Sequence, residues 1–191
     1  MAEIVTLTKT EYLIGQLDED PNPIIDMILS NYNEGRNMSK DITNIRYEDI
    51  RINFTPQIQR IVKKLCDEWY ESFGDEIELC WQNKEGQDPN SSFWAVIHNP
   101  NESTNLHSHE TSDNYESGAH VSAAIWVQVP PNSGNLVFQY HINPYKVRQE
   151  EIEAKPCKFA MFDSTLPHYV TKNLSNEQRI VISMNFRYKN Y

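Results

Sequence analysis

The stretch QRIVISMNFRY, residues 178–188, decides the fold class. Its side chains alternate between an apolar set and a more polar set, and the apolar set is Ile180, Ile182, Met184 and Phe186. Successive side chains of a β-strand point to opposite faces, so this alternation predicts a strand. The opposite face carries Arg179, Val181, Ser183 and Asn185. That face either meets water or lines an interior pocket for a charged ligand, and the alternation alone does not choose between the two.

Further strands are expected before this stretch, because runs rich in β-branched and aromatic residues are separated there by turn residues. The expected strands span residues 76–82, 92–98, 120–129, 135–140, 157–162 and 169–171. The sequence PPNSG at 130–134 is a clear turn between two of them. The connections at 99–119 and 141–156 are expected to be long loops, and long loops in a compact domain are usually functional or mobile.

The first part of the chain carries helical signals instead. Apolar residues recur at helical spacing between 56 and 73, namely Ile58, Ile61, Val62, Leu65, Trp69 and Phe73. Thr55 can cap this helix, Pro56 suits its first turn, and Gly74 can end it in a left-handed conformation. We expect its apolar stripe to pack on the outside of a sheet. A shorter helix is expected around 24–29, with short extended pieces at 4–8 and 12–14.

The order of these elements, with helices first and strands later, favours a β-sandwich or barrel supported by helices. A length of 191 residues suits one domain. We therefore predict a single domain over 1–191, in which residues 1–75 form a helical and irregular support and residues 76–191 form the β core.

Composition narrows the classes of partner and compartment. The net charge is −10 and no run of Lys or Arg is present, so a nucleic-acid partner is not expected. The three cysteines, Cys66, Cys80 and Cys157, are odd in number and far apart, which argues against a disulfide framework and fits a reducing compartment. No signal peptide or membrane-spanning run is recognised, so a soluble, intracellular protein without a membrane partner is expected. The oligomeric state is left open.

Three of the six histidines stand out by their context. His107 and His109 form an HxH motif, and residues at i and i+2 of an extended segment project to the same side, so both imidazoles can reach one metal ion. His168 follows Pro167 just before an expected strand. Imidazole suits Fe, Cu, Ni and Zn. The alternative is that the HxH consists of two polar loop residues.

The other histidines carry weaker signals. His120 and Trp126 share a face of the strand expected at 120–129 and could line a pocket, although a structural role for both is favoured. His98 and His141 belong to no motif and are expected to be structural.

Taken in order, these motifs resemble a known superfamily over Phe93 to Phe186, about half of the chain. The matching pieces are Asn99, His107–His109, Ser122–Trp126, Gly134–Phe138, Phe162, Leu166–His168 and Asn173–Asn185. They resemble the 2-oxoglutarate/Fe(II) oxygenases, and within them a small HxH-containing group common in marine bacteria and in tailed phages of cyanobacteria. If the phage likeness holds, the compartment would be the cytoplasm of an infected host.

The resemblance implies a mainly β fold, a double-stranded β-helix of the jelly-roll or cupin-like kind, with the N-terminal helices packed outside. It implies that His107 is the proximal and His168 the distal ligand of Fe(II). Arg179 would pair with the C5 carboxylate of the cosubstrate 2-oxoglutarate, since a planar guanidinium suits bidentate contact. Ser183 would add a hydroxyl contact. The implied reaction couples oxidative decarboxylation of 2-oxoglutarate to oxidation, as a hydroxylation, of a small-molecule or peptidyl substrate.

The second metal ligand departs from the superfamily's usual HxD or HxE motif, because position 109 is His. Three interpretations stay open. His107, His109 and His168 can form a three-histidine site, Glu110 or Asp113 can supply the missing carboxylate, or the site has lost its metal.

Two other functions compete with this reading. One is a cupin-like dioxygenase that uses three histidines and iron without 2-oxoglutarate. The other is a non-catalytic β-barrel, such as a phage structural or host-binding protein. Arg179 discriminates between the two enzymes, because an enzyme without 2-oxoglutarate needs no guanidinium at that place.

Overall fold

The computed structural model of the chain describes residues 10–33, 48–50, 52–80, 92–109 and 118–189. In this part of the chain the helices are α1 (Asn22–Asn33) and α2 (Pro56–Phe73). The strands are β1 (Tyr12–Gln16), β2 (Glu48–Ile50), β3 (Ile77–Leu79), β4 (Phe93–His98), β5 (Thr104–His107), β6 (Val121–Gln128), β7 (Leu136–Asn143), β8 (Lys146–Ile152), β9 (Lys158–Asp163), β10 (His168–Val170) and β11 (Arg179–Tyr188).

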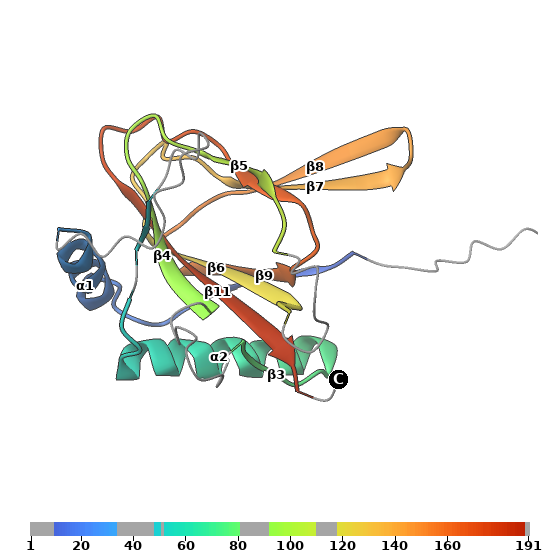
Figure 1. Cartoon of the computed structure of the whole chain (residues 1–191), viewed down its shortest axis with the longest axis horizontal. Coiled ribbons are helices and arrows are strands. Elements are labelled where there is room, and N and C mark those ends of the chain that lie inside the picture. The colour runs from blue at the N-terminus through green and yellow to red at the C-terminus, as the bar shows by residue number, and fades with distance from the viewer. Residues whose placement is uncertain (1–9, 34–47, 51, 81–91, 110–117, 190–191) are drawn as a thin grey trace, which may run out of the picture.

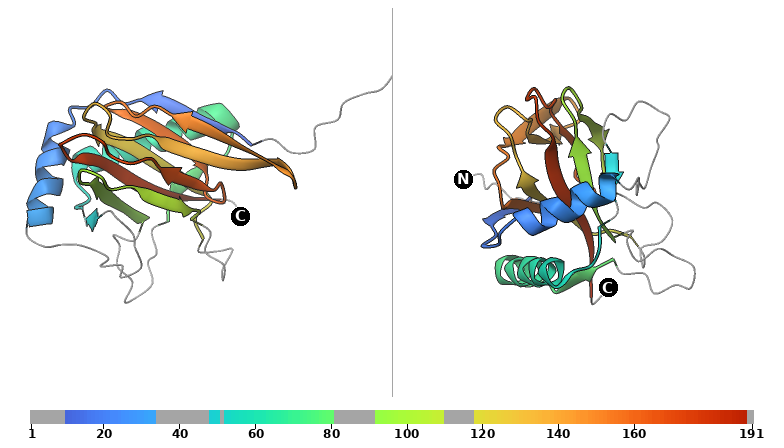
Figure 2. Two further views of the ribbon diagram at one scale, coloured as in Figure 1. Left: turned by 90° about the horizontal axis from the view of Figure 1, so that it is seen from above. Right: turned by 90° about the vertical axis from the view of Figure 1, so that its left-hand side faces the viewer.

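The strands form two antiparallel sheets that face each other (Figure 1). The larger sheet has seven strands in the order β1-β9-β6-β11-β4-β2, with β3 paired to β11. The smaller sheet has four strands in the order β5-β10-β7-β8. The fold is a double-stranded β-helix with helices on its outside, as the resemblance implies. Figure 2 shows α1 and α2 on the side of the large sheet that faces away from the small one.

The alternation of β11 is confirmed, and it separates two environments. The apolar residues Ile180, Ile182, Met184 and Phe186 are fully buried in a core shared with α2. The other face of the strand looks into the space between the two sheets, where Arg179 is only 1% exposed. The pocket interpretation of that polar face is therefore correct, and the solvent interpretation is wrong.

Helix α2 forms for the reasons that its sequence gives. The Thr55 hydroxyl accepts a hydrogen bond from the backbone N–H of Ile58, at 3.2 Å, and Pro56 occupies the first turn. Gly74 ends the helix at φ 81°, and its N–H donates to the carbonyl of Tyr70. The buried stripe of the helix, which includes Trp69, packs against the large sheet, and this positions β11 from behind.

The two expected long loops contain strands, so these two predictions are wrong. β5 lies within 99–119, and the β7–β8 hairpin fills most of 141–156. β8 is exposed up to its last residue and stands at the edge of its sheet, so it shows no apolar alternation. β5 has only four residues, too few for a periodic signal.

The N-terminal part contributes strands as well as helices. β1, at the extended piece expected around 12–14, pairs with β9, and β2 pairs with β4. The extended piece expected at 4–8 lies outside the described residues. No described helix is both long and apolar enough to cross a membrane.

Candidate metal centre

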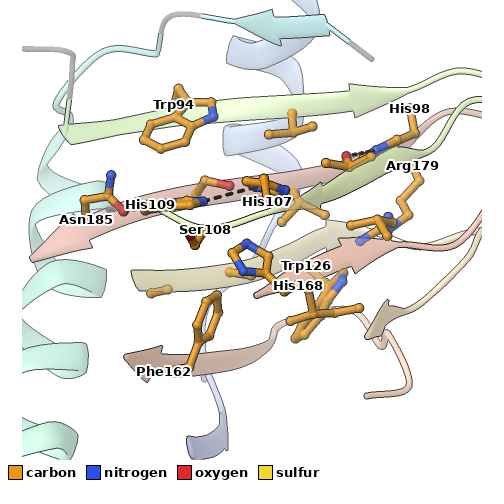
Figure 3. Close-up of a pocket in the computed structure, with 18 residues that line it drawn as sticks. Trp94, His98, His107, Ser108, His109, Trp126, Phe162, His168, Arg179 and Asn185 are labelled. Atoms are coloured by element: carbon orange, nitrogen blue, oxygen red, sulfur yellow. Dashed lines mark hydrogen bonds between the residues drawn. The ribbon is translucent and has the colours of Figure 1, made fainter. Parts of the chain in front are cut away.

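The three histidines singled out by the sequence converge at one point between the sheets (Figure 3). His107 ends β5, His168 begins β10, and the two residues are direct partners in the β5–β10 ladder. His109 follows two residues after His107. Each histidine offers one ring nitrogen, and these nitrogens all lie within 4.8 Å of one another. The fold thus gathers side chains from two segments that are far apart in the sequence.

Backbone carbonyls orient two of the three rings. His107 Nδ1 lies 2.8 Å from the carbonyl oxygen of Asn105, and His168 Nδ1 lies 2.9 Å from that of Leu166. A carbonyl only accepts hydrogen bonds, so Nδ1 must carry the proton and donate it. In a neutral imidazole the Nε2 atom then holds the free lone pair, which is the form that binds a metal ion.

Side chains orient the third ring. His109 Nδ1 donates to Asn185 Oδ1 at 2.8 Å, and the Ser122 hydroxyl donates to the same oxygen at 2.9 Å. His109 Nε2 faces His107 Nε2 at 3.3 Å. When both rings are neutral and carry their proton on Nδ1, these Nε2 atoms present two lone pairs to each other. Two facing lone pairs repel unless a cation lies between them, so the donor set fits a metal ion.

Burial favours the neutral form of two of these rings, those of His168 and His109. Desolvation, helped by His107, lowers the pKa of His168 to about 3, and desolvation likewise lowers the pKa of His109. A metal ligand must be unprotonated, so a low pKa removes the competition between proton and metal at neutral pH. The site therefore fits an ion of the class that imidazole prefers, such as iron.

A cavity of about 330 Å³ extends from the histidines between the two sheets. Arg179 and Ser183, to which the resemblance gives contacts with 2-oxoglutarate, both line it, as does Trp126. His120 does not contribute to its walls and instead accepts a hydrogen bond from the backbone N–H of Tyr188. His141 is exposed on the β7–β8 hairpin. Glu110 and Asp113 lie outside the described residues.

Arg179 is a fully buried side chain in the wall of this cavity. Its Nε and Nη1 atoms have no hydrogen-bond partner among the described residues, and no described carboxylate pairs with it. Desolvation lowers its pKa to about 9, which still leaves the guanidinium charged at neutral pH. An unpaired buried charge is very costly, so this position calls for an anionic ligand.

His98 is the cavity residue that the sequence did not single out. It lies directly opposite Arg179 in the β4–β11 ladder, and its Nε2 is 2.8 Å from the Thr104 hydroxyl. Burial and the nearby Arg179 charge lower the pKa of His98 to about 3. The prediction that His98 is merely structural missed its place in the cavity wall. His98 reaches the cavity because of the register between β4 and β11, and this register cannot be predicted from the sequence pattern.

Comparisons with known proteins add to this geometry. The model of a family described as "Putative 2OG-Fe(II) oxygenase", where 2OG is 2-oxoglutarate, matches residues 92–185, about half of the chain. The matched segment holds all three converging histidines and Arg179. No curated protein sequence matches the chain.

Solved structures share the fold at low sequence identity. A prolyl-4-hydroxylase from Pseudomonas putida has 13% identity and a TM-score of 0.65, over 93% of this chain and 92% of that one. The alpha-ketoglutarate-dependent carbocyclase SnoK from nogalamycin biosynthesis has 10% identity and a TM-score of 0.69, over 93% and 79%. HygX from Streptomyces hygroscopicus, with nickel and 2-oxoglutarate bound, has 9% identity and a TM-score of 0.58, over 95% and 84%.

Proposed function

Since the chain belongs to the 2-oxoglutarate/Fe(II) oxygenase superfamily, we propose that it is a hydroxylase whose iron is held by three histidines. The superfamily makes it an enzyme that uses Fe(II) and the cosubstrate 2-oxoglutarate. The histidine set, the hydroxylation and the residue roles below are the proposal.

One observation carries the proposal. A buried guanidinium that pairs with no described carboxylate lines the same cavity as three imidazoles whose Nε2 atoms turn inward. 2-Oxoglutarate has a 2-oxo acid end that can chelate a metal and a distal carboxylate that can pair with a guanidinium. The cavity therefore presents complementary groups for both ends of this one molecule.

The roles of the side chains follow from these positions. His107, His109 and His168 would hold Fe(II), which when bound supplies the activation of O2 that is coupled to decarboxylation of 2-oxoglutarate. Arg179 would bind and orient the C5 carboxylate, and the Ser183 hydroxyl would add a contact on the same strand. The hydrogen bonds at Nδ1 hold the three rings in orientations that turn their Nε2 atoms inward.

The inward position of His109 supports the three-histidine set over the other two interpretations. Its Nε2 turns toward His107 rather than toward solvent, and Asn185 fixes it there. The carboxylate alternative, with Glu110 or Asp113, predicts instead that metal affinity survives loss of His109.

The substrate class and the biological setting are also part of the proposal. We propose a small-molecule or peptidyl substrate, a place in the HxH-containing group of marine bacteria and cyanobacterial phages, and action inside the cell. The rival cupin-like dioxygenase leaves the buried Arg179 without a partner, and a non-catalytic barrel explains neither Arg179 nor the lone pairs at His107 and His109.

Succinate release tests the proposal directly. Protein loaded with Fe(II) and given 2-oxoglutarate and O2 should release succinate slowly even without a substrate, as uncoupled turnover. His168→Ala should abolish this release, and His141→Ala, which changes an exposed histidine, should not. Equal succinate release by wild type and His168→Ala would contradict the proposed function.

A further inference from the structure

Trp126 is a second buried donor in the wall of the cavity. Its side chain is fully buried on β6, and its Nε1 has no hydrogen-bond partner among the described residues. An indole N–H can only donate, and buried donors in native proteins nearly always find an acceptor. Its acceptor is therefore missing from the described part of the chain, as is that of the Arg179 guanidinium.

The sheet register places these two donors side by side. Trp126 is the direct partner of Val181 in the β6–β11 ladder, two residues after Arg179, and the register shifts between Ile180 and Val181. Trp126 and Arg179 both line the cavity, so they lie on the same face of the sheet. Near neighbours on one face of adjacent strands lie within reach of aromatic and long side chains. Figure 3 shows both side chains at the same end of the cavity, away from His109.

The chemistry of this end is that of a carboxylate site. A guanidinium and an indole N–H together offer only donors and one positive charge. An ionised carboxylate offers only acceptors, with room for a guanidinium fork and one further donor. A neutral amide or alcohol would leave the charge of Arg179 uncompensated.

We propose that Trp126 Nε1–H donates the second contact to the distal carboxylate of 2-oxoglutarate, beside Arg179. This inference rests on the proposed function and adds a specificity-determining residue to it. A 2-oxo acid without the distal carboxylate leaves the guanidinium and the indole N–H unpaired at once. The pair therefore selects 2-oxo dicarboxylates against 2-oxo monocarboxylates.

The test compares two ligands on three proteins by calorimetry, with Zn(II) in the metal site to prevent turnover. 2-Oxoglutarate carries the distal carboxylate and 2-oxopentanoate does not. Trp126→Phe should weaken 2-oxoglutarate binding about 10- to 100-fold, the range for a hydrogen bond to a charged group, and should leave 2-oxopentanoate unchanged. Trp69→Phe is the matched control, because Trp69 Nε1 is also buried with no partner in the described part of the chain, but it lies in the core behind the sheet. It should change neither affinity.

A measurement on the wild-type protein does not depend on how the variants fold. The indole N–H resonance of Trp126, assigned with Trp126→Phe, should move downfield in the NMR spectrum when 2-oxoglutarate is added and should not do so with 2-oxopentanoate. An unmoved resonance, or equal weakening of both ligands by Trp126→Phe, would overturn the inference. If Arg179→Ala still loses 2-oxoglutarate in that case, the proposed function stands. If wild-type protein binds no 2-oxoglutarate, the proposed function itself has failed.

Discussion

His98 and Arg179 face each other across the β4–β11 ladder, so an imidazole and a guanidinium are buried side by side. Both groups are almost fully removed from water, and burial lowers both pKa values, to about 3 for His98 and about 9 for Arg179. Only the guanidinium is therefore charged at neutral pH. This arrangement leaves a single positive charge at the end of the cavity, which suits a single carboxylate.

The neutral state of His98 predicts a pH dependence of stability. In the unfolded chain its pKa returns to about 6.5, so below that pH the unfolded state binds a proton that the folded state refuses until about pH 3. The contribution of His98 is complete above pH 6.5 and is lost as the pH falls toward 3. At pH 5 this loss should amount to roughly 2 kcal/mol.

Urea unfolding of metal-free wild type and His98→Gln at several pH values checks this effect. The difference between their free energies of unfolding should shrink or reverse as the pH falls from 7 to 5, because Gln does not titrate. A difference that is constant over this range would show that His98 is not held neutral. The comparison cancels the titration of the carboxylates, which both proteins share.

Asn185 should control metal affinity through His109. Asn185→Ala removes the acceptor that fixes His109 Nδ1, so the ring loses its orientation and its preferred tautomer. We expect metal affinity to fall about 10- to 100-fold, measured by competition with a chelator. Ser183→Ala, two residues away on the same strand face, should leave metal affinity unchanged. Equal affinities of wild type and Asn185→Ala would show that the contact does not support a metal ligand.

His109 itself distinguishes the two candidate ligand sets. His109→Ala should lose stoichiometric iron if three histidines bind the metal, and the purified protein can be analysed for iron after reconstitution. The double variant Glu110→Ala, Asp113→Ala should keep its iron. The reverse pattern would establish the carboxylate alternative and would exclude His109 as a ligand.

Arg179→Ala should separate cosubstrate binding from metal binding. Loss of a charge-assisted bidentate contact should weaken 2-oxoglutarate binding by a few kcal/mol, about 1.5–3 for each such hydrogen bond, while iron binding survives. Arg187→Ala is the matched control, since Arg187 lies on the same strand but pairs with Glu78 outside the cavity, at 2.7 Å. If Arg179→Ala binds 2-oxoglutarate as tightly as the wild type, Arg179 does not bind the cosubstrate, and the structure then supports only a metal-binding β-barrel.

The parts of this fold that the sequence predicts are those with strong local periodicity. β11 shows period-2 alternation and α2 shows a helical stripe with both caps, and both elements are confirmed. β5 is too short and β8 too exposed to show a pattern, so both were mistaken for loops. The division of the chain into a support and a β core stays a prediction.

The same limit applies to the site. The HxH motif and His168 could be recognised because their spacing and context are local. The roles of His98 and Asn185 depend on contacts between distant strands, such as the hydrogen bond that joins His109 to Asn185 across 76 positions of sequence. These contacts depend on the register between paired strands, which cannot be predicted from the composition or from the spacing of residues.

Anaerobic titration with Fe(II) and 2-oxoglutarate tests the central claim most directly. The account predicts that wild-type protein binds one Fe(II) and that adding 2-oxoglutarate then produces the weak visible charge-transfer band of the metal–2-oxo acid chelate. Under the same conditions Arg179→Ala should need far more 2-oxoglutarate to reach the same band, and His168→Ala should show none. Stoichiometric iron in the wild type with no band at saturating 2-oxoglutarate would contradict the account.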